Sequence, residues 1–123
     1  MKLHSSRATA LNTLTAYGEG WLEINAQRYP HAVLVRPEAP VQAWAPATFE
    51  ALSAADFEVI AALAPEVVLL GTGARQRFPS PRLIAALSAR RIGVEAMDTG
   101  AACRTYNILM TEGRAVLAAL LPP

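Results

Sequence analysis

Cysteine and histidine are scarce in this sequence. Its 123 residues include one cysteine, Cys103, and two histidines, His4 and His31, which lie far apart in the chain. A single cysteine excludes an internal disulfide, and two separated histidines do not make a cluster of metal ligands. We therefore expect no disulfide framework and no bound metal.

Charge is also sparse, and no apolar run is long. Charged residues make up 17% of the chain, hydrophobic residues 53%, and the formal net charge is +1. A near-neutral chain has no overall attraction for nucleic acid, so no nucleic-acid partner is expected. No run approaches the ~20 apolar residues of a membrane span, and the N-terminus lacks a secretory signal, which predicts a cytoplasmic protein. The low charge leaves apolar surface that a protein partner or a second copy could cover, as in a homo-oligomer.

The residues that are present fit one domain over residues 1–123. From Ser53 onward, helical patterns alternate with buried strand patterns; the helices are expected at about 53–64, 80–91 and 100–112, and the strands at 66–70, 92–97 and 115–121. Ser53 and Ser80 are the expected N-caps of the first two helices, and Gly93 the expected end of the second. The last run, AVLAALL, has the composition of a strand or of a helix, and its short length favours a strand. This alternation implies crossover connections and a largely parallel sheet.

The first third of the chain has the patterns of antiparallel β-structure. Residues 1–17 form either an irregular arm or an edge strand. Residues 21–29 and 31–36 are two expected strands, which would pair as a hairpin if the chain reverses near Asn25 to Arg28. Residues 41–45 are a short extended piece with Trp44 on the sheet, or a surface loop. The predicted fold is a three-layer α/β domain whose central mixed, largely parallel sheet is flanked by helices and carries an N-terminal antiparallel β extension.

Two strand ends carry the candidate site. Gly71, Thr72 and Gly73 follow one expected parallel strand, and Asp98, Thr99 and Gly100 follow the next. The carboxyl ends of parallel strands meet at one edge of a sheet, where ligands usually bind. Arginines lie beside both ends, at Arg75, Arg77, Arg82 and Arg104. Their guanidinium groups could hold a small anionic ligand or an acidic surface of a partner protein.

Both motifs also match well-known catalytic or cofactor patterns, but each match is incomplete. A dinucleotide-binding loop would need a third glycine where Gln76 stands, and a helix that starts sooner, so a simple glycine turn is favoured and no cofactor is expected. The Asp98-Thr99-Gly100 triplet has the letters of an aspartic-protease site, which needs two such aspartates, and this chain has one copy. Capping of the following helix by Asp98 or Thr99 is the favoured role.

The helix after Asp98 contains two further polar residues of interest. Cys103 lies in its first turn beside Arg104, and both features lower the pKa of a thiol, but no histidine is near in sequence to act as a base. A buried small side chain is therefore favoured over a nucleophile. Asn107 lies among the apolar residues of the same helix, and it either hydrogen-bonds a neighbouring loop or belongs to the binding set.

Two stretches, GTGARQRFPSPRL at 71–83 and MDTGAACRTYNILMTEGRAVLAALL at 97–121, resemble a known family. This is the small domain of unknown function shared by bacterial and archaeal proteins, by the adipogenesis-associated domain protein of animals and by the third mitochondrial complex I assembly factor. The resemblance covers about residues 18–121 and implies a three-layer α/β fold, no established catalytic activity and, for the mitochondrial members, assembly of a respiratory complex through protein contacts. The family's signature positions fall here on Gly71, Gly73, Phe78, Pro79, Met97, Asp98, Thr99, Ala102, Thr105, Tyr106, Asn107, Glu112 and Arg114. Ten arginines against one lysine are consistent with a bacterial source.

The functional hypothesis is a non-enzymatic binding module, an assembly or accessory factor that uses residues 71–77 and 98–104. The alternative is an enzyme or small-molecule carrier that binds an anion at the helix start from Thr99 to Ala101, with Asp98 as acid or base. A third reading is a structural unit of a homo-oligomer.

Overall fold

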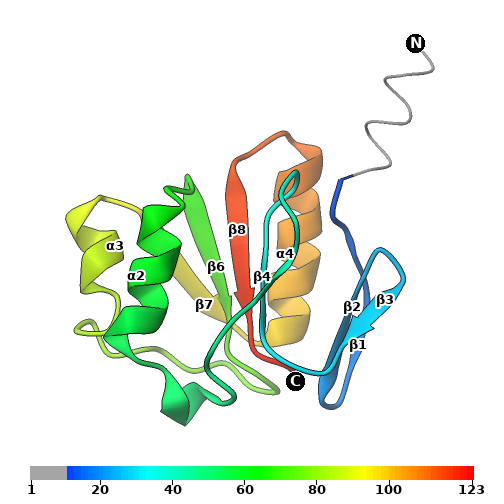
Figure 1. Cartoon of the computed structure of the whole chain (residues 1–123), viewed down its shortest axis with the longest axis horizontal. Helices are drawn as coiled ribbons and strands as arrows, with labels where there is room; N and C mark the ends of the chain where they lie inside the picture. Colours follow the sequence, from blue (N-terminus) through cyan, green and yellow to red (C-terminus); the bar gives the residue numbers. More distant parts are fainter. Residues whose placement is uncertain (1–10) are drawn as a thin grey trace.

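Two β-sheets organise the part of the chain that the computed structural model describes, residues 11–123. A five-stranded mixed sheet has the order β5-β4-β8-β6-β7, and a smaller antiparallel sheet has the order β1-β2-β3 (Figure 1). The strands of the larger sheet are β4 (Val33–Val35), β5 (Gln42–Ala43), β6 (Val67–Gly71), β7 (Gly93–Met97) and β8 (Val116–Leu120). Those of the smaller sheet are β1 (Leu14–Gly18), β2 (Trp21–Ile24) and β3 (Gln27–Tyr29).

The last apolar run of the chain forms the central strand. β8 is buried at all five positions and pairs with β6 in parallel and with β4 antiparallel, so that Ala118 faces Leu69 on one side and Val35 on the other. A strand buried on both faces has apolar residues at every position rather than at alternate ones. The expectation of a strand at 115–121 is confirmed.

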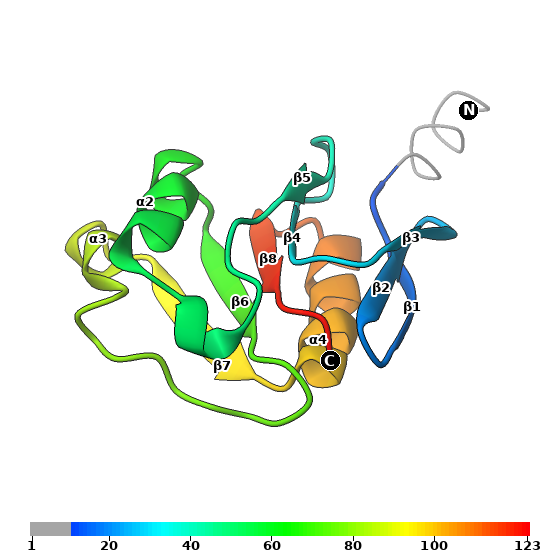
Figure 2. The same cartoon turned by 60° about the horizontal axis from the view of Figure 1, so that its bottom comes forward.

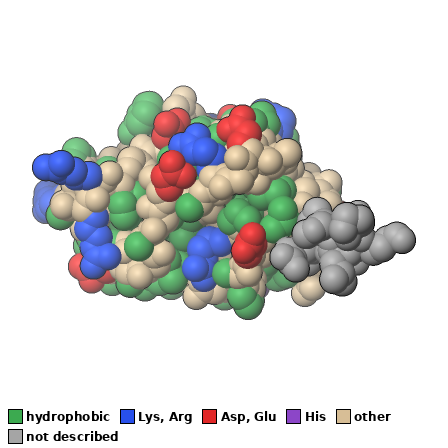
Figure 3. Space-filling model, turned by 90° about the horizontal axis from the view of Figure 1, so that it is seen from above, with side chains coloured by type: hydrophobic (Ala, Val, Ile, Leu, Met, Phe, Trp, Pro, Cys, Tyr) green, Lys and Arg blue, Asp and Glu red, His purple; other side chains and the backbone are tan. Residues whose placement is uncertain are grey.

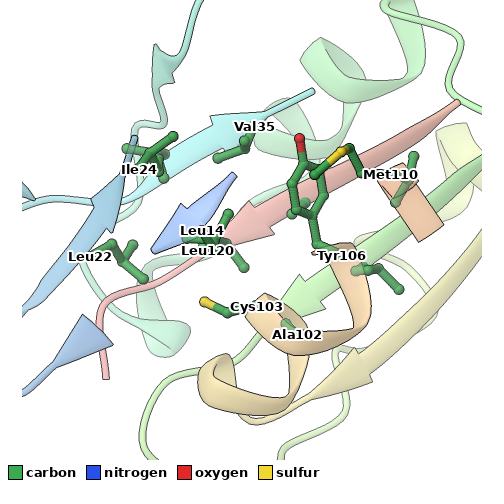
Figure 4. Close-up of a cluster of buried hydrophobic side chains, with 13 residues drawn as sticks. Leu14, Leu22, Ile24, Val35, Ala102, Cys103, Tyr106, Met110 and Leu120 are labelled. Carbon is green, nitrogen blue, oxygen red and sulfur yellow. The ribbon is translucent and has the colours of Figure 1, made fainter. Parts of the chain in front are cut away.

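Helices and the smaller sheet cover the larger sheet in three layers. Helices α2 (Ala54–Ala62) and α3 (Ala85–Ala89) pack on one face, and α4 (Thr99–Thr111) packs on the other with the small sheet beside it (Figure 1). Figure 4 shows the core on the α4 side, where Tyr106 and Met110 meet Leu14, Ile24 and Leu120. The predicted α/β class, with its mixed sheet, flanking helices and antiparallel extension, is confirmed.

The N-terminal third differs from the expected hairpin. The chain reverses at Asn25 and Ala26, whose φ angles are +51° and +69°, and positive φ at both central residues is what a tight two-residue hairpin turn requires. Residues 21–29 therefore form a hairpin by themselves, β2 with β3, while β4 leaves this sheet and joins the larger one. The expected reversal near Asn25 to Arg28 is confirmed, whereas the expected pairing of 21–29 with 31–36 is wrong. β1 is an edge strand of the small sheet, and residues 1–10 of the expected arm lie outside the described residues.

Short segments around α2 follow the expectations more closely. Ser53 and Asp56 form a capping box at the start of the helix, in which the Ser53 N–H donates to Oδ2 of Asp56 at 2.8 Å. Residues 42–43 form β5, and the buried Trp44 meets Phe57 edge to face with their centroids 5.8 Å apart. A 3₁₀-helix, η1 (Phe49–Ala51), precedes α2, and no pattern in the sequence indicated it.

The helix after the basic loop is shorter than expected. It begins at Ala85 rather than near Ser80, because residues 80–84 form turns. Arg91, at φ +58°, ends it in place of Gly93: its N–H donates to Ser88 O and the N–H of Ile92 donates to Leu87 O. That is the bond pair of a Schellman motif, here built on arginine instead of glycine. β7, expected to be buried, is an edge strand with exposed and half-buried residues.

Candidate functional site

The two strand ends of the predicted site meet at one edge of the sheet, which faces forward in Figure 2. The N–H of Thr72 donates to Met97 O at 2.9 Å, and the N–H of Thr99 donates to Gly73 O at 2.9 Å. The structure therefore brings residues 71–73 and 97–100 together, because β6 and β7 are adjacent parallel strands. They form a continuous, hydrogen-bonded strand-end surface.

Thr99 joins three segments at this edge. Its buried hydroxyl accepts the N–H of Gly73 at 2.8 Å and donates to the carbonyl oxygen of Leu121 at 2.6 Å. The close approach explains the glycine at 71, where a Cβ would lie 2.9 Å from Oγ1 of Thr99. Thr72 shapes the next turn, since its hydroxyl donates to Arg75 O at 2.7 Å and accepts the N–H of Arg77 at 3.1 Å.

The start of α4 is occupied by the chain itself. Oδ1 of Asp98 accepts the N–H of Ala101 at 2.9 Å, and the Asp98 carbonyl accepts the N–H of Ala102 at 3.0 Å, so Asp98 is an N-cap. Gly100 is buried under the phenol of Tyr17, whose oxygen would lie 2.7 Å from a Cβ at that position. The N–H groups of Thr99, Ala101 and Ala102 already have partners, which leaves little of the helix terminus open to an anion.

The arginines of the site differ in how they are held. Nη1 of Arg77 lies 2.7 Å from Oε2 of Glu50, and its guanidinium stacks over Phe49 at 4.3 Å from the ring centroid. The hydrogen bond from Arg77 lowers the pKa of the Glu50 carboxyl. Nη1 of Arg104 donates to the Tyr17 hydroxyl at 2.7 Å.

Other parts of the same surface reach outward. Arg75 and Arg82 are exposed, and the side chain of Phe78 is 76% exposed in the loop between them. The surface thus combines guanidinium groups with a protruding aromatic ring. That combination is typical of the anchoring residues of protein interfaces.

Cys103 and Asn107 serve the interior of the domain. Burial raises the pKa of the Cys103 thiol to about 12, against a smaller lowering effect of Arg104, so the thiol stays protonated. The expected role of a buried small side chain fits its 2% exposure. Asn107 donates to Leu14 O at 2.9 Å and accepts the N–H of Leu14 at 3.0 Å, so its amide pairs with β1 rather than facing the strand-end surface.

The residues that sequence reasoning missed come from distant segments. Arg104 contacts Tyr17 of β1, and Arg77 contacts Phe49 and Glu50 of η1. The backbone carbonyl of Leu121 accepts the hydrogen bond from Thr99. No local pattern marks them, since each reaches the surface only through the sheet order. The exposed Phe78 is one of the family's signature positions, and arginines and prolines flank it in the sequence.

A groove of about 490 Å³ lies at the opposite end of the sheet and was also not foreseen. Figure 3 looks onto this end, where hydrophobic side chains lie among basic and acidic ones. Its apolar wall includes Leu63, Met110 and Val116, and Arg36 and Arg114 stand beside them. Four separate chain segments contribute to it, which is why no single stretch of sequence predicts it.

Within residues 11–123, no three His, Cys, Asp or Glu side chains are grouped so that they could hold a metal ion. Over the same range, no helix has the length and apolar character needed to cross a membrane.

Fold and surface together define a small three-layer α/β domain with a basic, aromatic strand-end surface. Residues 14–121 match the model of a family described as proteins of unknown function, DUF498/DUF598, and the chain belongs to this family. The resemblance stated from the sequence is thereby confirmed.

Relatives with names or structures extend the comparison. The chain is 33% identical over 112 residues to the cattle (Bos taurus) NADH dehydrogenase [ubiquinone] 1 alpha subcomplex assembly factor 3, covering 89% of this chain and 60% of that protein. It is similar to a crystal structure of a Bordetella parapertussis protein, with 52% identity, a TM-score of 0.88 and coverage of 94% and 99% of the two chains. A solution structure from Bordetella pertussis, described as a Mth938-like domain, matches at 44% identity and a TM-score of 0.83, covering 94% of this chain and 88% of that one. The chain spans about 60% of the length of the assembly factor relatives.

Proposed function

We propose that this protein is a non-enzymatic binding module that acts as an assembly or accessory factor through its strand-end surface. The observation that carries the proposal is the contrast within that surface. The side chains of Asp98 and Thr99 form hydrogen bonds within the domain, whereas Arg75 and Phe78 are exposed. Groups that a catalytic site would need to offer to a substrate are engaged, and groups that bind a protein surface are free.

The electrostatics of the surface favour an acidic partner. Arg75 and Arg104 are exposed there, Arg82 is exposed farther along the loop that follows β6, and Glu50 is the acid that pairs with Arg77. Guanidinium groups form paired hydrogen bonds with carboxylates, and an exposed aromatic ring between them supplies apolar area. We therefore infer a partner segment that carries carboxylates around an apolar pocket.

The names of the relatives suggest which assembly process to measure. Several animal relatives are named as assembly factors of NADH dehydrogenase. Because the chain spans 60% of the cattle and human proteins and 71% of the zebrafish protein, that role is transferred here as part of the proposal. The proposal also includes a cytoplasmic location. Cell fractionation tests that location.

Complementation tests the surface directly. In cells that lack the gene, the amount of assembled NADH dehydrogenase would be measured by native gel activity after expression of the wild type or a variant. The test variant replaces Arg75, Arg77 and Arg104 by alanine. The matched control is Arg36→Ala at the opposite end of the sheet, which also removes a partly exposed guanidinium.

We expect the triple variant to lose assembly while it keeps the thermal stability and secondary structure of the wild type, and we expect Arg36→Ala to complement. Full complementation by a folded triple variant would refute the proposal. The small-molecule alternative has its own test, a thermal-shift screen with phosphate, carboxylates, nucleotides and flavins. A shift that Asp98→Ala abolishes would favour that alternative, because a ligand at 100 times its dissociation constant adds about 2.7 kcal/mol of stability.

A further inference from the structure

The outer edge of β7 is a five-residue strand edge at the end of the larger sheet. β7 pairs with β6 on one side and ends the sheet on the other (Figures 1 and 2). Thr72 N–H donates to Met97 O, and alternate residues of a strand direct their N–H and C=O groups to the same side. The backbone groups of Glu95 and Met97 therefore face β6, and those of Val94 and Ala96 face outward.

Part of this edge is already capped. The side-chain amide of Gln76 donates to Ala96 O at 3.0 Å, and the N–H of Ile92 donates to Leu87 O at 3.0 Å. Within residues 11–123, the N–H and C=O of Val94 and the N–H of Ala96 have no hydrogen-bond partner on that side. An unpaired edge of this kind can pair with another strand.

An apolar hollow adjoins the free edge. It measures about 500 Å³ and lies between β7 and the loop that carries Phe78, Pro79 and Ile84. The ring of Phe78 itself is 76% exposed. The hollow therefore gives the free edge an adjoining apolar surface, which a second copy paired along the edge would cover.

We propose that β7 pairs antiparallel with β7 of a second copy of this chain, about a two-fold axis at Val94. Both larger sheets then join into one continuous sheet. Val94 of one copy faces Val94 of the other, and each exchanges its N–H and C=O with its counterpart. The N–H of Ala96 reaches the carbonyl of Ile92 in the other copy. The free donors of the edge are thereby paired, and the capped groups at Ile92 and Ala96 lie at the two ends of the ladder.

Charge and side-chain size select this register. An axis at Glu95 would set two carboxylates directly opposite each other, which destabilises a strand pair. With the axis at Val94, Glu95 faces Gly93 of the second copy, which has no side chain to obstruct it. Arg91 ends α3 two residues before Gly93 and is exposed, so in the second copy it supplies a positive charge close to the position that Glu95 faces. Two β-branched valines meet on the other face of the pair, which favours strand pairing.

Sedimentation equilibrium on the purified chain tests the pairing across a wide range of concentration. We expect the mass to rise from 13.1 kDa toward twice that value as the concentration increases. Val94→Pro removes an outward N–H and leaves the β6 ladder intact, because proline is tolerated where the N–H of an edge strand faces solvent. It should weaken self-association at least tenfold, which corresponds to about 1.4 kcal/mol.

A charge exchange provides a second route that does not alter the backbone. Glu95→Arg and Arg91→Glu should each weaken self-association, and the double variant should restore it. Glu58→Arg is the matched control, since Glu58 is an exposed acid on α2 away from this edge, and it should leave the equilibrium unchanged. If Val94→Pro fails to fold, the charge exchange still decides the matter.

Amide hydrogen exchange by NMR locates the interface. The N–H groups of Val94 and Ala96 should gain protection as concentration rises, whereas those of Glu95 and Met97 should be protected at every concentration. A chain that stays monomeric throughout refutes the proposal and leaves the edge to a strand of a different protein. Self-association that neither Val94→Pro nor Glu95→Arg alters refutes it as well, because it places the contact elsewhere.

Discussion

Removing the hydroxyl of Thr99 tests whether one side chain holds the strand-end surface together. Thr99→Val keeps the shape of the side chain but removes its hydroxyl. The N–H of Gly73 and the carbonyl of Leu121 then lose the hydrogen bonds that they make to this hydroxyl, at 2.8 Å and 2.6 Å. Each buried group left without a partner costs roughly 1–3 kcal/mol. We expect the free energy of unfolding to fall by about 3 kcal/mol, and, for a domain of this size, the melting temperature to fall by roughly 10 °C.

Urea denaturation followed by circular dichroism measures this loss of stability. The slope of the unfolding free energy against urea concentration should be the same in the variant and the wild type. Thr99→Ser, which keeps the hydroxyl, should recover most of the stability. Thr111→Val is the matched control, because its exposed hydroxyl bonds only to Asn107 O inside α4. That control should cost less than about 0.5 kcal/mol. A loss below about 1 kcal/mol for Thr99→Val would show that the three segments are held by other contacts, and the reasoning would be wrong.

Two further substitutions and one pH dependence test the same structure. Gly71→Ala should lower the free energy of unfolding by about 1–3 kcal/mol in urea denaturation, because a Cβ there would meet Thr99 and Leu120 at 2.9 Å, whereas Gly93→Ala meets nothing within 4 Å and should be neutral. The contribution of the Cys103 thiol to the stability of the wild type should fall by roughly 1.4 kcal/mol per pH unit from pH 9.0 toward about pH 12, since the unfolded thiol ionises there while the folded one stays neutral. Denaturation at a series of pH values checks this, and a Cys103→Ala variant with the same slope would contradict it. Asn107→Asp should cost about 1–3 kcal/mol at neutral pH by losing the donor to the β1 carbonyl, and the loss should shrink in acid, where the protonated acid can donate again.

Local signals account for the features that the sequence predicted correctly. Ser53 with Asp56 marks a helix start, EVVLL and AVLAALL mark strands buried on both faces, and Asp98 marks the start of α4. Each signal acts between residues a few positions apart, so the sequence contains all that is needed to recognise it. The strand ends at 71–73 and 98–100 could be placed together for the same reason, because two adjacent parallel strands end at one edge.

The features that sequence reasoning missed depend on contacts between distant segments. The hairpin at Asn25 and Ala26 needed positive φ without a glycine, and Arg91 likewise took the helix-ending conformation that Gly93 was expected to supply. In both cases surrounding hydrogen bonds outweigh the intrinsic preference of the residue. The position of β7 at the edge of the sheet, with Phe78 beside it, depends on the order of the strands. The periodicity of apolar residues does not specify that order.

The sequence by itself determined the α/β class, the buried central strand and the two glycine-containing strand ends, because composition, spacing and capping are local properties. Only the tertiary structure decided what those ends can do. It placed Tyr17 over Gly100, joined Thr99 to the carbonyl of Leu121, and paired Arg77 with Glu50. Such partners are close in space and far apart in the chain. Packing of β1 and β8 against α4 brings the first two pairs together, and the third forms where the loop after β6 meets η1.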